Sequence, residues 1–335
     1  MGLTSKSTGV GAIDTGLHIV RQEASDRVVA LAGNPNGGKS TVFNELTGLN
    51  QHTGNWPGKT VTNAQGTCRY RDKNYILVDI PGTYSLMAHS AEEEVARDFI
   101  CFGEPDAVVV VCDATCLERN LNLVLQTIEI TENVVVCVNL MDEAKKKKIT
   151  IDLKGLSKEL GVPVVGAAAR SGKGLDEMMR ALETLPQRGN GRKAITVQYI
   201  KPIEEAIDLA LPAIEEKVAG KINARWLALK LLDYDETLVL ALGEYLGYDL
   251  MAEEEVKAGI QAGLDHLEEA GITREQLRDK IVASLVLTAE GVCAETVTFH
   301  KETYNARDRR IDRILTSKWT GFPIMIAMLA VIFWI

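Results

Sequence analysis

Short apolar runs alternate with amphipathic stretches over the first half of the chain. The runs are rich in valine and isoleucine and are apolar at consecutive positions, as strands buried on both faces of a parallel sheet are. The stretches between them repeat apolar residues at helical spacing. This alternation predicts a doubly wound α/β domain. The predicted strands cover 28–32, 75–80, 107–112, 134–140 and 162–167, and the predicted helices cover 91–102, 117–130, 151–160 and 175–185.

The pattern changes after Pro202, where helical spacing takes over. A Gly-rich polar break at 187–193 is the predicted linker. We therefore expect an N-terminal extension (1–26), an α/β domain (27–186) and a small, acidic, all-helical domain (187–300). The helices of that domain are predicted over 203–218, 224–232, 236–246, 252–270 and 274–294.

The last part of the sequence combines a basic segment with an apolar one. Six basic side chains fall within 301–318, and Thr320 is the one clearly polar side chain of 319–335. A membrane helix needs about 20 apolar residues, and basic residues gather at the cytoplasmic end of a span. We expect 301–318 to be a juxtamembrane linker and 319–335 to be the start of a transmembrane helix. The alternative is an apolar helix buried in a soluble fold.

Composition narrows the classes of function. The chain of 335 residues has a net charge of −9, which argues against nucleic acid as its main partner. Its six cysteines form no C-x-x-C pair and its five histidines are scattered, so neither a zinc site nor a disulfide scaffold is expected. No signal peptide is evident in 1–26. These features favour a folded part in the reducing cytosol.

The strongest local signal follows the first predicted strand. It reads Gly33-Asn34-Pro35-Asn36-Gly37-Gly38-Lys39-Ser40-Thr41, a match to G-x-x-x-x-G-K-[ST] between a strand and a helix. The glycines let backbone N–H groups face phosphate oxygens, and the helix N-terminus adds a positive dipole end. Lys39 offers a charge to the β- and γ-phosphates, and Ser40 offers a hydroxyl to Mg²⁺. The motif predicts a phosphate-binding loop.

Two further motifs and a threonine point to guanine. Asp79-Ile80-Pro81-Gly82 ends a predicted strand, where Asp79 can hold Mg²⁺ through water and the Gly82 N–H can sense the γ-phosphate. Asn139-Leu140-Met141-Asp142 ends another, and a carboxylate there accepts two hydrogen bonds that guanine, unlike adenine, donates. Thr60 offers Mg²⁺ a second hydroxyl. Each motif alone is weak, but their order and placement predict a GTP/GDP site.

The residues around these motifs resemble one family closely. G-N-P-N-G-G-K-S-T-V-F-N-E-L-T-G at 33–48 and N-Q-H-T-G-N-W-P-G-K-T-V at 50–61 resemble the N-terminal region of prokaryotic ferrous iron transport protein B (FeoB). D-I-P-G-T-Y-S-L at 79–86 and V-A-R-D-F at 95–99 are similar as well. The family couples a cytosolic G domain to a polytopic membrane domain that moves Fe²⁺ inward. The resemblance implies a Ras-like P-loop GTPase fold with a mostly parallel six-stranded sheet, followed by a helical spacer.

The resemblance also implies a setting and partners. It places the protein in the cytoplasmic (inner) membrane as a multi-pass protein, with residues 1–318 on the cytoplasmic side. The implied partners are its own membrane domain, the lipid bilayer, transported Fe²⁺ and small accessory proteins. No nucleic acid is expected, and a homo-oligomer is left open.

Residue roles transfer by position. Thr60, within Gly58-Lys59-Thr60, resembles the switch I threonine that contacts Mg²⁺ and the γ-phosphate. Asn36 resembles the asparagine that binds K⁺ in potassium-activated relatives, where switch I backbone, here from Gly54 to Trp56, completes the site. A K⁺ there would do the electrostatic work of an arginine finger. Ala168-Ala169-Arg170 stands where the family usually reads S-A-R.

Three departures matter. Thr83 replaces the water-orienting glutamine of Ras-like proteins, which predicts slow hydrolysis. Ala168 replaces the serine of the last motif; we still expect the Ala169 N–H to reach the guanine oxygen, with faster GDP release. Lys59 stands where a small apolar residue is common and is expected to alter switch I mobility.

Other interpretations compete with a transporter-linked GTPase. A soluble, potassium-activated, ribosome- or RNA-associated GTPase would need a basic appendage, whereas 203–299 is acidic. A nucleotide-sensing scaffold with negligible turnover stays open, because Thr83 provides no general base. The run Lys145-Lys146-Lys147-Lys148 is expected to be a solvated loop, with anionic lipid as the alternative partner.

Overall fold

The computed structural model describes residues 19, 21, 23, 25–48, 51–56, 59, 61–185 and 194–299. Gly58, Thr60, the predicted linker 301–318 and the predicted span 319–335 lie outside the described residues. Among the helices that are described, none has the length and apolar character to cross a bilayer.

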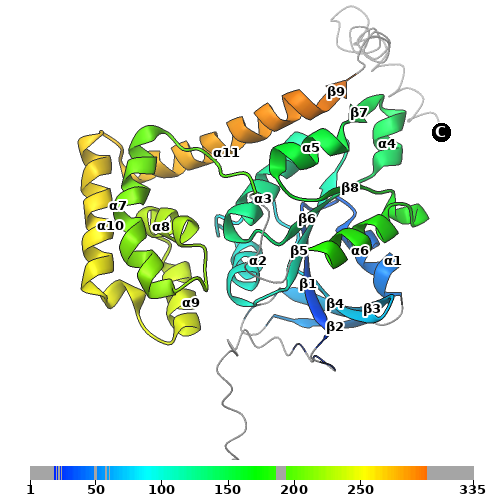
Figure 1. The fold of residues 1–335 in the computed structure, drawn as a ribbon, viewed down its shortest axis with the longest axis horizontal. Helices are drawn as coiled ribbons and strands as arrows, with labels where there is room; N and C mark the ends of the chain where they lie inside the picture. The colour runs from blue at the N-terminus through cyan, green and yellow to red at the C-terminus, as the bar shows by residue number, and fades with distance from the viewer. Residues whose placement is uncertain are drawn as a thin grey trace, which may run out of the picture.

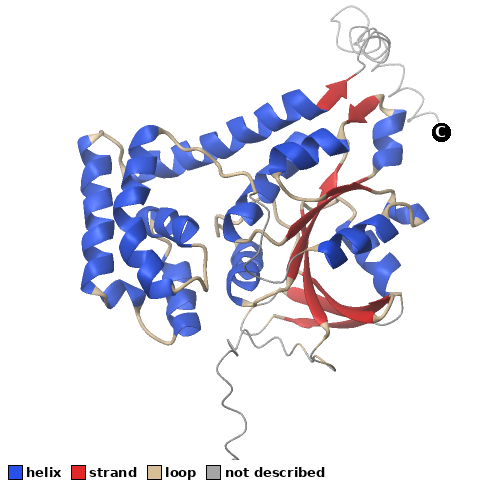
Figure 2. Cartoon of the chain, viewed as in Figure 1, coloured by secondary structure: helices blue, strands red, loops and turns tan. Residues whose placement is uncertain are grey.

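A seven-stranded sheet forms the centre of the α/β domain, in the order β2-β3-β4-β1-β5-β6-β8 (Figure 2). Neighbouring strands are parallel from β4 to β8, and β2 and β3 add an antiparallel edge. The five predicted strands are confirmed, but the predicted total of six is wrong by one. The strands are β1 (Arg27–Gly33), β2 (Gln51–Asn55), β3 (Thr62–Tyr70), β4 (Lys73–Asp79), β5 (Ala107–Asp113), β6 (Val134–Asn139) and β8 (Val164–Gly166).

Helices cover both faces of the sheet, as the doubly wound prediction requires (Figure 1). One apolar layer joins the sheet to α1 and α6, through residues such as Val42 and Met178. The other joins it to α2, α3 and α5, through residues such as Phe99 and Leu121. The helices are α1 (Lys39–Thr47), α2 (Ala91–Phe102), α3 (Leu117–Ile130), α4 (Met141–Lys146), α5 (Leu153–Leu160) and α6 (Leu175–Thr184), with a short 3₁₀ turn η1 (Ala169–Ser171).

The second half of the chain is helical, and its five predicted helices are confirmed. Helix α7 packs along α10, while α11 runs back across the molecule and contacts α3 and α5 (Figure 1). After α11, β9 (Val297–Phe299) pairs antiparallel with β7 (Ile149–Ile151) of the first half. These helices are α7 (Lys201–Val218), α8 (Ala224–Asp233), α9 (Glu236–Leu246), α10 (Glu254–Glu269) and α11 (Arg274–Thr296), with a 3₁₀ turn η2 (Leu250–Ala252).

Charged side chains are buried where the two halves meet. Arg97 of α2 is fully buried and pairs with its neighbour Asp98, at 2.7 Å, and with Asp235, the residue before α9. Lys230 of α8 is buried with its Nζ 3.0 Å from Met87 Sδ. Because a buried charge is costly without a partner, these contacts hold the helices against α2 and the loop after β4.

Candidate nucleotide-binding site

The loop between β1 and α1 can be built only with glycine at two positions. A Cβ on Gly33 would lie 2.6 Å from the Val111 carbonyl oxygen of β5. Gly38 has φ 85°, and a Cβ there would lie 2.3 Å from Asn139 Nδ2. Asn36 also adopts a left-handed φ, 69°, which asparagine tolerates. The loop therefore lies tightly against the ends of β5 and β6, in the form that the motif predicts.

The N-terminus of α1 has backbone N–H groups that can bind an anion. Gly38 is the N-cap and no side chain caps the helix, so its first N–H groups are not taken by a capping oxygen. Pro35, Asn36 and Ser40 are exposed, whereas the Asn34 side chain is buried. Asn34 therefore contributes to this loop through its backbone.

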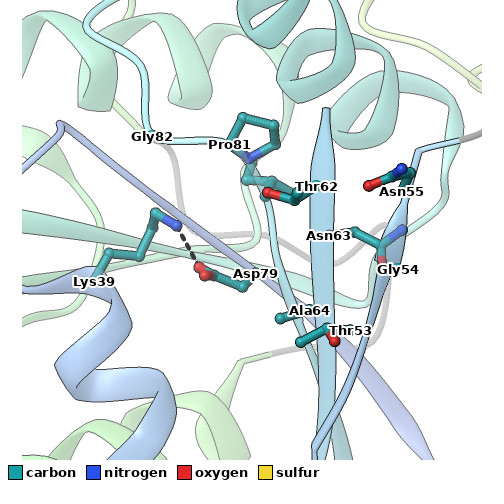
Figure 3. A pocket seen from close by; sticks show the side chains of 11 residues that line it. Lys39, Thr53, Gly54, Asn55, Thr62, Asn63, Ala64, Asp79, Pro81 and Gly82 are labelled. Atoms are coloured by element: carbon teal, nitrogen blue, oxygen red, sulfur yellow. Dashed lines mark hydrogen bonds and ion pairs between the residues drawn. The ribbon is translucent and has the colours of Figure 1, made fainter. Parts of the chain in front are cut away.

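Lys39 and Asp79 form an ion pair beside this loop, and both side chains are largely buried (Figure 3). They line an open pocket of about 600 Å³ together with Gly82 and Pro81 of the loop after β4 and Gly54 of β2. Burial raises the pKa of the Asp79 carboxyl above its ordinary value, and the Lys39 ammonium acts in the opposite direction. The two charges that the motifs assign to phosphate and Mg²⁺ thus neutralise each other in this structure.

The chain after Asp79 runs alongside the phosphate loop. The Ile80 N–H donates to the Leu31 carbonyl and the Thr83 N–H donates to the Gly33 carbonyl, both at 3.2 Å. At Gly82, a Cβ would lie 3.5 Å from Pro35 N. The Thr83 hydroxyl is buried and donates to the Ser85 carbonyl at 2.7 Å. Thr83 is therefore engaged in its own turn and offers no base to a water molecule.

Gln126 of α3 holds the next part of this segment, which extends to Met87. Its Oε1 accepts a hydrogen bond from the Leu86 N–H at 2.8 Å. No motif marks Gln126 in the sequence, because α3 reads as an ordinary amphipathic helix there. Its place was therefore missed by sequence reasoning.

The side chain of Asn139, at the end of β6, is hydrogen-bonded to the phosphate loop and to the loop that carries Ala169. Its Nδ2 donates to the Gly37 carbonyl at 3.2 Å, and its Oδ1 accepts the Ala169 N–H at 3.0 Å. The Ala169 N–H, which is expected to reach a guanine oxygen, donates to Asn139 Oδ1 in this structure. Leu140 follows with φ 62° and turns the chain into α4. Asp142 is exposed in the first turn of α4.

The last motif begins next to Asn139. The Ala168 N–H donates to the Lys173 carbonyl at 3.0 Å, so a backbone bridge closes this loop without a serine hydroxyl. The Met141 N–H donates to the Ala167 carbonyl at 3.1 Å. Arg170 is exposed. The loops carrying Asp142 and Arg170 thus lie side by side beyond the phosphate loop.

The residues predicted for switch I lie in two different places, one at the pocket and one in the core. Gly54 lines the pocket with Lys39 and Asp79, as do Asn55 and Asn63 of the β2–β3 pair. Trp56 instead is buried, with its ring 5.4 Å from the ring of Phe99 of α2, so its side chain packs in the core. Asn36 and Trp56 are not among the residues that line this pocket. Asn55 lies within the Gly54–Trp56 stretch that the resemblance marks, whereas Asn63 of β3 carries no motif and sequence reasoning missed it.

Lys59 also contacts α2. Its Nζ lies 2.5 Å from Glu94 Oε2, and both side chains are partly exposed. This ion pair links switch I to α2.

Comparison with known proteins identifies the family. The profile of the family described as ferrous iron transport protein B matches residues 27–182, and that of the FeoB cytosolic helical domain matches residues 199–298. The Fe(2+) transporter FeoB of Salmonella typhimurium is 31% identical over 310 residues, which are 91% of this chain and 38% of that protein. A Fe(2+) transport protein A/Fe(2+) transporter FeoB fusion protein of Porphyromonas gingivalis is 32% identical over 94% of this chain and 36% of its own length. This chain thus spans less than two fifths of the length of these relatives.

Solved structures agree with these matches. A GDP-bound S. thermophilus NFeoB mutant has a TM-score of 0.69 and 32% identity, covering 81% of this chain and 100% of that one. The cytosolic domain of the T. maritima FeoB iron transporter in a GMPPNP form has a TM-score of 0.64 and 32% identity, covering 81% and 99%. The G-domain fold, the phosphate loop and both family profiles agree: the chain belongs to the ferrous iron transport protein B family.

Proposed function

We propose that this chain binds GTP and GDP with Mg²⁺ and hydrolyses GTP slowly, with stimulation by K⁺, as the cytosolic regulatory part of an Fe²⁺ transporter. The G-domain fold supports GTP hydrolysis. The observation that carries the proposal is the Lys39–Asp79 ion pair, held beside a glycine-built phosphate loop at a pocket of about 600 Å³.

The residues of the pocket fit a magnesium nucleotide. Lys39 and Asp79 are largely buried charges of opposite sign, and each needs a partner. A triphosphate would take Lys39, while Asp79 would be left to hold Mg²⁺ through water. Ser40 and Thr60 would supply hydroxyl ligands to the same ion. Bound Mg²⁺ would neutralise charge on the β- and γ-phosphate oxygens.

The base would lie between the loops that Asn139 joins. Asp142 is exposed at the start of α4 and free of the packing that buries Asn139, so its carboxylate can accept from guanine. Leu140 and Met141 set the direction of this turn, and residues 168–170 lie on the other side. Asn139 is a positioning residue for both loops, because its amide is hydrogen-bonded to each.

Hydrolysis would depend on charge rather than on a protein base. Thr83 is engaged in its turn, so the chain relies on Lys39, the Gly82 N–H and a cation. Asn36, Gly54 and Trp56 are the proposed K⁺ contacts, with Thr60 closing over the γ-phosphate. A K⁺ at this place would stabilise developing charge in the transition state.

Asn36→Ala tests this arrangement. GTP hydrolysis is measured in KCl and in NaCl, with GDP affinity as the control for an intact site. We expect the wild type to turn over faster in KCl and the variant to show one slow rate in both salts with GDP affinity kept. Equal K⁺ stimulation of the two proteins would remove the cation site, and no turnover in either salt would favour a nucleotide-sensing scaffold.

Iron movement is proposed for the whole protein. The relatives are Fe²⁺ transporters, and the membrane domain, the bilayer and Fe²⁺ itself are the proposed partners. The fusion with transport protein A in the P. gingivalis relative supports a small accessory protein. We place residues 1–318 on the cytoplasmic side of a multi-pass inner-membrane protein. Asp79→Ala in the complete transporter should abolish Fe²⁺ uptake at unchanged protein level; normal uptake would contradict a regulatory role.

A further inference from the structure

A run of four lysines ends helix α4. Lys145, Lys146, Lys147 and Lys148, named the lysine patch from here on, are all exposed. The helix stops at Lys147, and Lys148 turns the chain with φ 56° directly into β7. The base-recognition loop of the proposed site lies at the other end of the same short helix. The lysine patch plays no part in the proposed nucleotide chemistry.

The lysine patch lies beside the end of β9. Ile149, the residue after the patch, pairs with Phe299 across the β7–β9 ladder, and paired strands lie about 5 Å apart. Phe299 is the last described residue. Figure 1 shows α4, β7 and β9 together at one end of the molecule, far from α7 and α10. The lysine patch therefore lies next to Phe299, the residue that ends β9.

The sequence that follows Phe299 has the composition of a membrane approach. Residues 301–318 carry six basic side chains against three acidic ones, and the apolar segment 319–335 comes next. The lysine patch adds four positive charges beside the start of this segment. Basic residues at the cytoplasmic end of a span are attracted to the negative lipids of that leaflet.

The lysine patch differs in charge from the rest of the protein. The whole chain has a net charge of −9, so it is not drawn to an anionic surface in any arbitrary orientation. Two exposed lysines of the helical half are paired one to one with carboxylates, Lys201 with Glu205 at 3.1 Å and Lys257 with Glu254 at 3.3 Å. Within the lysine patch, Lys146 pairs with Glu143 at 2.8 Å, and Asp142 is the other carboxylate of α4, so the four lysines outnumber the two acidic residues of this helix. The patch keeps a local excess of positive charge, effective over a Debye length of about 8 Å.

We propose that the lysine patch docks the G domain on the anionic lipid headgroups of the bilayer. This inference rests on the proposed function, since it needs the apolar segment in a membrane. Asp142, in the first turn of α4, would then lie about 4.5 Å along the helix axis from Lys145 and about 6 Å from Lys146, because each helical residue rises about 1.5 Å. Lipid contact and guanine recognition would share one short helix.

Lysine acetylation measures this contact one side chain at a time. The chain is reconstituted in phosphatidylcholine nanodiscs with or without phosphatidylserine, and each lysine's acetylation rate is read by mass spectrometry. Attraction worth about fivefold in occupancy per lysine should slow acetylation of the lysine patch severalfold in the anionic discs. Lys201 and Lys257, exposed but on the helical half, serve as internal controls and should react equally in both discs.

A charge-reversed variant separates lipid contact from local packing. In Lys145→Glu/Lys147→Glu, the remaining Lys146 and Lys148 should lose their dependence on phosphatidylserine, while Lys201→Glu/Lys257→Glu should leave that dependence intact. Equal acetylation of the lysine patch in neutral and anionic discs would overturn the docking surface. Failure of the chain to enter either disc would instead overturn the membrane part of the proposed function.

Discussion

Glu129 makes the seam between the two halves of the molecule sensitive to pH. It lies on α3, where its Oε1 accepts a hydrogen bond from the Tyr199 hydroxyl at 2.7 Å. Burial raises the pKa of Glu129 to about 7, from an ordinary 4.5. The Tyr199 hydrogen bond and the charges of Lys230 and Arg225 lower this pKa, and Glu204 raises it. The folded protein therefore binds a proton that the unfolded chain releases between these two values.

The sign of the effect follows from that difference. Below pH 4.5 both states are protonated, and the raised pKa contributes its full stabilisation. Between pH 4.5 and 7 the native state holds more protons, so the free energy of unfolding falls as pH rises. For pKa values of 4.5 and about 7, the loss between pH 5 and pH 8 is about 2–3 kcal/mol. Glu129→Gln keeps the shape of the side chain and removes the titration.

Denaturation in urea at pH 5 and pH 8, followed by tryptophan fluorescence, measures the effect in both proteins. We expect wild-type stability, relative to Glu129→Gln, to fall by about 2–3 kcal/mol from pH 5 to pH 8. The comparison between variants cancels the titration of all other groups that the two proteins share. A relative stability that stays constant, or that rises with pH, would refute the assignment of a raised pKa to Glu129.

Two further substitutions test the seam and the phosphate loop. Arg97→Met should lower the free energy of unfolding by about 3–5 kcal/mol, because it leaves Asp98 and Asp235 without their shared buried partner. In urea denaturation, adding Asp235→Asn to this variant should recover part of the lost stability. A further loss equal to that of Asp235→Asn alone would argue against coupling between the two residues. Gly38→Ala should weaken GDP binding at least tenfold in calorimetry, because its Cβ would lie 2.3 Å from Asn139 Nδ2 at φ 85°; unchanged affinity would mean that the loop has room.

Strands with apolar side chains on both faces were predictable, and the edge strands were not. Val134–Asn139 is a continuous apolar run because helices cover both sides of it. Strand Gln51–Asn55 is at the edge of the described sheet, where it pairs with β3, and residues 52–55 are exposed, so its polar residues carry no periodic signal. The apolar pattern therefore missed Gln51–Asn55, and it missed its partner Thr62–Tyr70 as well. The sheet has seven strands where the pattern predicted five and the resemblance implied six.

Site residues could be predicted from the sequence where the backbone conformation restricts the residue type. Hydrogen-bond partners could not be predicted where several acceptors are available to one donor. Gly38 and Asn139 follow from motifs, since each position tolerates few residues. The Ala169 N–H could not be assigned in advance, because Asn139 Oδ1 and a guanine oxygen compete for the same donor. Arg97 and Gln126 lie on helices with an ordinary amphipathic pattern. Their partners, Asp235 and the Leu86 N–H, are distant in sequence, so only the folded structure shows these contacts.

Titration calorimetry of the chain with Mg²⁺ and GTP, GDP or ATP tests the central claim most directly. We predict heat from GTP and GDP and none from ATP, loss of that heat in Lys39→Ala, and a preference shifted towards xanthine nucleotides in Asp142→Asn. Equal heat from ATP and GTP, or no heat from either guanine nucleotide, would contradict the account.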